Sequence, residues 1–152
     1  RVLFRSPDDV EPVNWAMAEF AARMSAVALG LALDQAHRFR RALRGWWAQG
    51  WDLLVTPTLA APPLPVGAIA NDAADPLAPM RRAGEWVAFT TAYNTSGQPA
   101  ISLPMHWTPD GLPVGVQLVA DYGREDLLIA VAARLEEHSP WAHRRPPLDA
   151  SW

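Results

Sequence analysis

Hydrophobic residues recur at steps of three and four across residues 11–50, and this spacing predicts helix. The apolar positions of this stretch are Phe20, Met24, Val27, Leu31, Leu43, Trp46 and Trp47. Charged residues at the same steps are expected on the opposite face, namely Asp34, Arg38 and Arg41. Gly30 costs about 1 kcal/mol relative to alanine inside a helix. The pattern therefore fits either one long helix or two shorter helices.

A contiguous apolar run from Leu53 to Val55 predicts a buried strand, which a proline at position 57 brings to an end. The following residues, 59–80, are rich in proline, and proline does not fit the interior of a helix or a sheet. We interpret them as an extended surface connection inside one domain that covers residues 1–152. Residues 1–10 show no period and are interpreted as a short strand or arm followed by a loop.

Helical spacing resumes from Arg81 to Ala92, with Trp86, Phe89 and Tyr93 along one side. We expect this helix to close at Asn94, with Gly97 in a left-handed conformation and Pro99 preventing continuation. The tripeptide that begins at Asn94 also matches the N-glycosylation pattern. Its place beside a tight turn between apolar segments favours the helix end over a glycan acceptor.

Two further strands are predicted, "AISLPM" at 100–105 and "LPVGVQLVA" at 112–120. The Pro-Asp-Gly sequence between them is typical of a turn, so the strands are expected to pair as a hairpin. Residues 121–138 have the pattern of an amphipathic helix. Its inward positions are Leu127, Leu128, Val131 and Leu135. The pattern thus predicts both helices and strands along the chain.

Composition removes several kinds of chemistry. The chain of 152 residues has no cysteine and no lysine, so it holds no disulfide, no thiolate nucleophile and no lysine base of its own. A formal net charge of −3 gives no general attraction to nucleic acid. No apolar run approaches the roughly 20 residues that a bilayer requires, so we expect no membrane partner. Absence of cysteine fits a reducing compartment, and we expect a cytoplasmic protein.

The remaining chemical candidates favour ordinary structural roles. The four histidines lack zinc-ligand spacing, so no metal or cofactor is expected. None of the six serines lies in a Gly-x-Ser-x-Gly turn. The carboxylate pairs at 125–126 and 136–137 fit the first turn and the solvent face of a helix. The basic run "RFRRALR" is interpreted as a solvated helix face rather than a nucleic-acid patch.

Four separated blocks carry a resemblance to a known family. They read "DLLVTPTLAAPPLPVGA", "FTTAYNTSGQPAISLPMHW", "DGLPVGVQLVA" and "GREDLLIAVAARLEE", and "PW" and "RRPP" follow the last. Together they closely resemble the C-terminal part of the amidase signature family, over roughly residues 11–147. The resemblance implies an α/β/α architecture around a large mixed β-sheet, of which this chain would form an incomplete C-terminal portion.

Members of that family use a lysine, a bridging serine and a nucleophilic serine, all set in the N-terminal two-thirds of the enzyme. This chain has no lysine and no Gly-Gly-Ser-Ser-like run, so we expect no catalytic residue in it. The resemblance implies that Phe89, Thr90 and Tyr93 line part of the substrate pocket and that the loop after Pro57 borders its entrance. In family members that act on glutamine for tRNA, an aspartate that binds the substrate amino group lies a few residues before this threonine, where Val87 or its neighbours stand here. This difference argues against recognition of free glutamine.

The function expected from this resemblance is a segment that completes the sheet and part of the substrate pocket of an amide C–N bond hydrolase. Its partners would be the remaining N-terminal part of the amidase polypeptide and a small-molecule amide, and on its own the chain is expected to be inactive. An open sheet edge would also allow self-association. The alternatives are a non-catalytic, stand-alone binding module and a truncated fragment.

Overall fold

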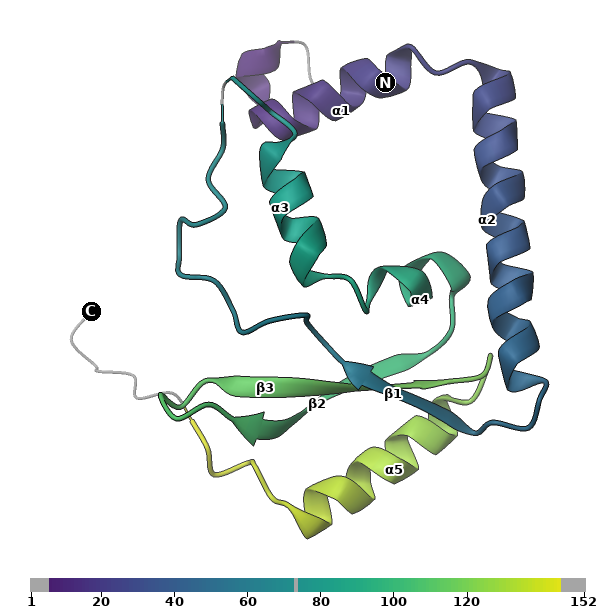
Figure 1. Ribbon diagram of the computed structural model, residues 1–152, viewed down its shortest axis with the longest axis vertical. Helices are drawn as coiled ribbons and strands as arrows, with labels where there is room; N and C mark the ends of the chain where they lie inside the picture. The colour runs from purple at the N-terminus through teal and green to yellow at the C-terminus, as the bar shows by residue number, and fades with distance from the viewer. Residues whose placement is uncertain (1–5, 73, 146–152) are drawn as a thin grey trace.

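A three-stranded antiparallel sheet forms the centre of the computed structural model, which describes residues 6–72 and 74–145 (Figure 1). Its strands are β1 (Leu53–Pro57), β2 (Ala100–Trp107) and β3 (Pro113–Ala120), in the spatial order β1-β3-β2. The last strand therefore lies between the other two. Of the predicted N-terminal strand or arm, residues 1–5 lie outside the described residues, and the short 3₁₀ helix η1 (Pro7–Asp9) follows.

The predicted hairpin of β2 and β3 is confirmed. Its turn has Gly111 at φ 88°, and the backbone N–H of Thr108 donates to the carbonyl of Leu112 at 2.9 Å. The pairing shifts between Pro104 and His106, where β2 carries a bulge. Because proline lacks an N–H and a bulge disrupts pairing, the outer edge of β2 is poorly suited to another strand.

β1 pairs with β3 from Leu53↔Ala120 to Pro57↔Val116. The backbone N–H of Thr58 donates to the carbonyl of Gly115, and this fixes which residues of β1 bond to β3. Leu53 and Val55 turn their N–H and C=O groups to the other side, where the described structure has no strand. The prediction of a buried strand is wrong for Val55, whose side chain is 59% exposed.

Helices cover both faces of the sheet (Figure 1). Helix α5 (Glu125–His138) packs on one face, and the cluster there consists of Leu103, Leu118, Ala120 and Leu128. The short helix α4 (Thr91–Ser96) and the end of α2 (Ala26–Trp47) lie on the other face, where Trp47, Tyr93 and Val119 form a second cluster. The layers are therefore helix, sheet and helix, as the α/β prediction requires.

The predicted helical region at 11–50 forms two helices, α1 (Pro12–Ala22) and α2. The break falls at residues 23–25, where the Ser25 hydroxyl accepts a hydrogen bond from the N–H of Ala28 and caps α2. Gly30 lies inside α2 without interrupting it. Among the described residues, no single helix is long and apolar enough to cross a membrane. The pair α1 and α2 meets that requirement only together, with a bend of 107° between them.

The predicted apolar face of this region is wrong at Phe20, Met24, Val27 and Leu31, which are 68%, 39%, 73% and 63% exposed. Val27 and Leu31 lie 11 and 7 positions before Arg38, and such separations place all three on one side of a helix. The apolar stripe of α2 instead runs through Leu29, Leu33, Leu43 and Trp47. Only its last turns pack on the protein, and Trp47 is the one residue of α2 that is fully buried.

The helix predicted from Arg81 to Ala92 is also two helices, α3 (Ala78–Trp86) and α4. The chain leaves helical geometry at Val87, and its carbonyl accepts hydrogen bonds from the hydroxyls of Thr90 and Thr91 at 3.2 and 3.1 Å. Threonine hydroxyls compete in this way with the helical hydrogen bonds. Helix α4 continues past Asn94 to Ser96, and Gly97 then takes the predicted left-handed conformation with φ 79°.

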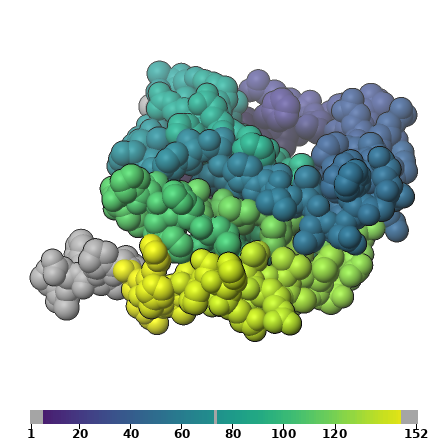
Figure 2. Space-filling view, turned by 60° about the horizontal axis from the view of Figure 1, so that its bottom comes forward, coloured from purple at the N-terminus to yellow at the C-terminus, as the bar shows by residue number. Residues whose placement is uncertain are grey.

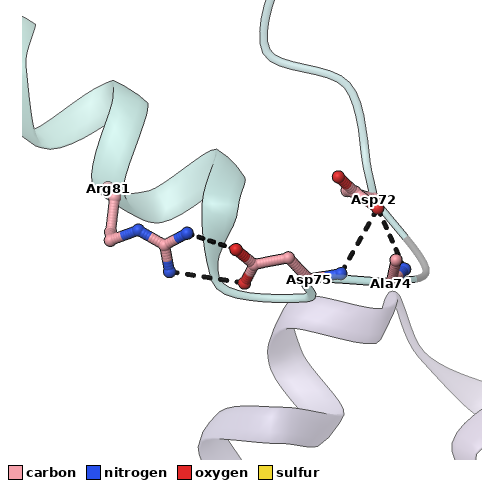
Figure 3. A network of polar contacts seen from close by, with 4 residues as sticks. All are labelled: Asp72, Ala74, Asp75 and Arg81. Atoms are coloured by element: carbon pink, nitrogen blue, oxygen red, sulfur yellow. Dashed lines mark hydrogen bonds and ion pairs between the residues drawn. The ribbon is translucent and has the colours of Figure 1, made fainter.

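The described residues of the connection from β1 to α3, 58–72 and 74–77, form no strand or helix, and the connection lies against the β2–β3 hairpin (Figure 2). Trp86 links the first part of the connection to α3, because the indole N–H donates to the carbonyl of Pro62 at 2.9 Å. At its far end the Asp72 carboxylate accepts the backbone N–H groups of Ala74 and Asp75 (Figure 3). The Asp75 carboxylate is paired with Arg81 of α3, so the start of α3 is tied to the connection.

Candidate functional site

Two open clefts adjoin on the face of the sheet that carries α4. The first has a volume of about 470 Å³ and lies between the connection and the strands. Its lining residues are Thr58, Leu59, Ala60, Ala61, Pro62, Pro63, Ser102, Pro104, Pro113, Val114 and Gly115. The loop after Pro57 thus forms one wall of this cleft.

The second cleft, of about 350 Å³, lies between the sheet and α4. It is lined by Thr58, Thr90, Tyr93, Asn94, Gln98, Ala100, Ile101, Ser102 and Gln117. Thr58 and Ser102 belong to both linings, so the two clefts meet at these side chains.

A hydroxyl pair marks the boundary between the clefts. The oxygens of Thr58 and Ser102 are 2.6 Å apart and share a hydrogen bond across the sheet. Both lie over Gly115, where a methyl group would be 2.6 Å from Thr58 Oγ1 and 2.8 Å from Ser102 Oγ. Glycine at this position therefore permits the pair to form.

Gln117 lines the second cleft and connects the elements around it. Its side-chain Nε2 donates to Thr56 Oγ1 and to the carbonyl of Phe89, both at 3.0 Å. These two bonds link the central strand to β1 and to the turn between α3 and α4. Gln117 is buried, so loss of either bond would leave a polar atom without a partner in a desolvated place.

Thr90 and Tyr93, which the sequence proposes as pocket residues, both line the second cleft. Phe89 is not among its lining residues, and its backbone carbonyl is the group that contacts Gln117. Tyr93 is only 9% exposed, and its ring packs with Trp47 and Val119. Burial raises the pKa of its phenol above the ordinary value of 10.0, so the hydroxyl is neutral at physiological pH.

No charged residue of the described part of the chain lines either cleft. Nor does any histidine of residues 6–72 and 74–145, so no general base from these residues faces the hydroxyls of Thr58 and Ser102. Among the described residues, histidine and carboxylate side chains do not gather in threes to make a metal site. The polar groups present are hydroxyls and carboxamides, which can donate to and accept from an uncharged amide.

Sequence reasoning did not single out Thr58, Ser102 or Gln117. A signal for them exists, because Ser102 and Gln117 are polar residues inside otherwise apolar strands and lie opposite each other in the β2–β3 register. Their alignment depends on the hairpin register, which the bulge shifts by one residue near its turn. Thr58 joins them only through the pairing of β1 with β3, which links distant parts of the sequence.

Comparison with known proteins places this geometry in context. The family model described as Amidase matches residues 4–129. The 6-aminohexanoate-cyclic-dimer hydrolase of Paenarthrobacter ureafaciens is 41% identical over 146 residues, covering 93% of this chain and 30% of that enzyme. An acylamidase of Rhodococcus erythropolis is 33% identical over 120 residues, covering 77% of this chain and 25% of that protein.

Two solved structures also match nearly the whole of this chain with about 30% of their own length. The structure of 6-aminohexanoate cyclic dimer hydrolase matches with a TM-score of 0.87 and 40% identity, covering 94% of this chain and 31% of that chain. A bacterial aryl acylamidase of the amidase signature family shares the fold with a TM-score of 0.68 at 24% identity, over 91% of this chain and 30% of that one. The chain thus spans about 30% of the length of these relatives.

Proposed function

This chain belongs to the amidase signature family, corresponding to a C-terminal part of its members, and we propose that it forms one wall of the substrate pocket of an amide C–N bond hydrolase. The remaining part of the polypeptide would complete the sheet beside β1 and enclose the clefts. Because Thr58 and Ser102 bond to each other and no base faces them, the nucleophile and its base would come from that remaining part.

The observation that carries the proposal on substrate is the absence of charge from both clefts. A charged ligand buried against such a wall would lose its hydration without gaining an opposite charge from this chain. An uncharged amide would instead exchange hydrogen bonds with water for bonds to hydroxyl and carboxamide groups. We therefore propose a linear or cyclic amide of little net charge, and a relative that hydrolyses 6-aminohexanoate cyclic dimer supports that class.

The first experiment is an assay of the full polypeptide that carries this chain. We expect hydrolysis of 6-aminohexanoate cyclic dimer or a neutral aryl amide, and little hydrolysis of zwitterionic glutamine. Preference for glutamine would contradict the proposed substrate class.

Substitutions in the wall test its role separately. Thr90→Ala and Ser102→Ala should raise KM by roughly tenfold, since one lost hydrogen bond costs on the order of 1 kcal/mol, and should leave kcat within a few-fold. Ser139→Ala, at the exposed end of α5, is the matched control and should change neither constant. If Ser102→Ala abolished kcat, Ser102 would be the nucleophile and the proposal for this wall would be wrong.

A further inference from the structure

A third cavity, of about 240 Å³, lies between α2 and the end of α4. Its lining residues are Arg40, Arg41, Arg44, Ser96, Gln98 and Tyr122. Among the residues that the structure describes, Gln98 is the one that it shares with the second cleft, and none of those in its lining is a carboxylate. We call it the arginine cavity.

The three arginines lie within five consecutive positions of α2, a little more than one helical turn, and line the same cavity. Arg40 donates from Nε to the carbonyl of Thr95 at 2.6 Å, which fixes α2 against α4. Arg41 and Arg44 form no ion pair or side-chain hydrogen bond within the described residues. Like charges three or four residues apart on a helix repel each other, and an anion between them would relieve that repulsion.

Gln98 supplies an independent sign of a ligand. Its side chain is 6% exposed, and its Oε1 accepts a hydrogen bond from the Ser96 hydroxyl at 2.7 Å. Its Nε2 is buried and has no partner within the described residues. A buried donor without an acceptor costs roughly 1–3 kcal/mol, and a turn of the Gln98 side chain toward an oxygen atom bound in the cavity would satisfy it.

We propose that the arginine cavity binds one oxyanion group, a carboxylate or a phosphate. Guanidinium groups match such oxygens in paired hydrogen bonds, and the Gln98 amide and Tyr122 hydroxyl add neutral donors. The volume is below the roughly 300–1,000 Å³ typical of pockets for larger ligands, which favours a single small group. That group belongs either to a free anion or to an acidic side chain of the remaining polypeptide.

Inorganic phosphate is the probe for a free anion, titrated by calorimetry into the full polypeptide at low ionic strength. We expect one phosphate per chain, with affinity at least tenfold weaker in the Arg41→Gln/Arg44→Gln double variant. Gln98→Leu should also weaken binding. Arg82→Gln is the matched control, since Arg82 is an exposed arginine of α3 outside the cavity, and it should bind phosphate like the unchanged protein.

If the bound oxyanion is instead an acidic side chain of the remaining polypeptide, the same variants should give a different result. Phosphate would then not bind, while Arg41→Gln/Arg44→Gln would lower the melting temperature relative to Arg82→Gln at neutral pH. That difference should vanish as the pH falls below about 4, where carboxylates become protonated.

The proposal is overturned if phosphate does not bind and the double variant melts like Arg82→Gln. It is also overturned if phosphate binds equally to the double variant, because the site would then lie elsewhere. Amide hydrolysis is not a readout here, so the result is independent of the proposed function.

Discussion

Gly115 has only a hydrogen atom beneath the hydroxyls of Thr58 and Ser102, and this lets the two side chains meet over β3. A methyl group there would be 2.6 Å from one hydroxyl and 2.8 Å from the other, closer than real carbon contacts allow. The residue that shapes the boundary between the clefts is therefore one without a side chain.

Gly115→Ala should lower the free energy of unfolding by about 1–3 kcal/mol, the usual cost of overpacking. Gly30→Ala is the matched control, because nothing lies within 4 Å of a methyl group there and α2 is helical. The control should be neutral or more stable by up to about 1 kcal/mol. Denaturant unfolding of both variants tests this, and equal midpoints would contradict the crowding seen at Gly115.

Tyr93 predicts a pH dependence of stability. Burial raises the pKa of its phenol, so above about pH 10 the unfolded chain releases a proton that the folded chain retains. The free energy of unfolding should therefore fall as the pH rises through this range. Tyr93→Phe should reduce the fall, because the variant has no phenol to titrate at this buried position. Unfolding curves between pH 8 and about 11 provide the measurement.

At the scale of helices and strands, the unpaired outer edge of β1 predicts which backbone amides of this strand exchange rapidly with solvent. Leu53 and Val55 point their N–H groups away from β3, whereas Leu54 and Thr56 point theirs toward it. In the chain alone, the amides of Leu53 and Val55 should exchange rapidly with solvent and those of Leu54 and Thr56 slowly. With the remaining polypeptide present, all four should be protected.

Amide hydrogen exchange followed by NMR resolves these four positions. Protection of Val55 in the isolated chain at high dilution would mean that the edge is already covered. Rapid exchange of Val55 in the complete polypeptide would mean that no strand pairs there.

Much of the element pattern could be predicted from the sequence, because it depends on local chemistry. The Pro-Asp-Gly turn placed the hairpin correctly, and Gly97 has the left-handed conformation expected of it. The break at Val87 was missed because it depends on two threonine hydroxyls bonding to one carbonyl instead of extending the helix. The face of α2 was misjudged because Val27 and Leu31 lie on the side of the helix that carries Arg38, whereas Leu43 and Trp47 lie on another side.

The candidate site was less predictable, since its residues meet through long-range pairing. Thr90 and Tyr93 were proposed from a resemblance, and both line the second cleft. Thr58, Ser102 and Gln117 become neighbours only after β1 and β2 both pair with β3. No local pattern in the sequences "TPT" or "AIS" predicts that Thr58 and Ser102 become neighbours in the folded chain.

At the scale of the whole molecule, large apolar side chains remain exposed on α1 and on the first half of α2. Phe20, Val27 and Leu31 are the most open of them, and no residue of α1 is buried. Such a surface is unusual for a stable monomer and marks a place where further protein packs. In the proposed enzyme, that protein is the remaining part of the polypeptide.

Without that part, the chain should self-associate as its concentration rises, with the open edge of β1 contributing. Val55→Lys should weaken association, because a charged side chain on an edge strand opposes pairing with another copy. Val66→Lys adds the same charge at an exposed position of the connection and is the matched control. Sedimentation velocity over a concentration series gives the measurement, and a monomer at every concentration would contradict the prediction.

The central place of β3 also bears on how the protein is made. Synthesis proceeds from the N-terminus, so β1 leaves the ribosome long before β3, its partner in the sheet, exists. During that interval the edge of β1 that pairs with β3 has no partner, and the apolar side chains of α2 are also exposed. A nascent chain with β1 unpaired in this way is prone to aggregate. Until the β2–β3 hairpin emerges, β1 is an apolar segment to which chaperones can bind.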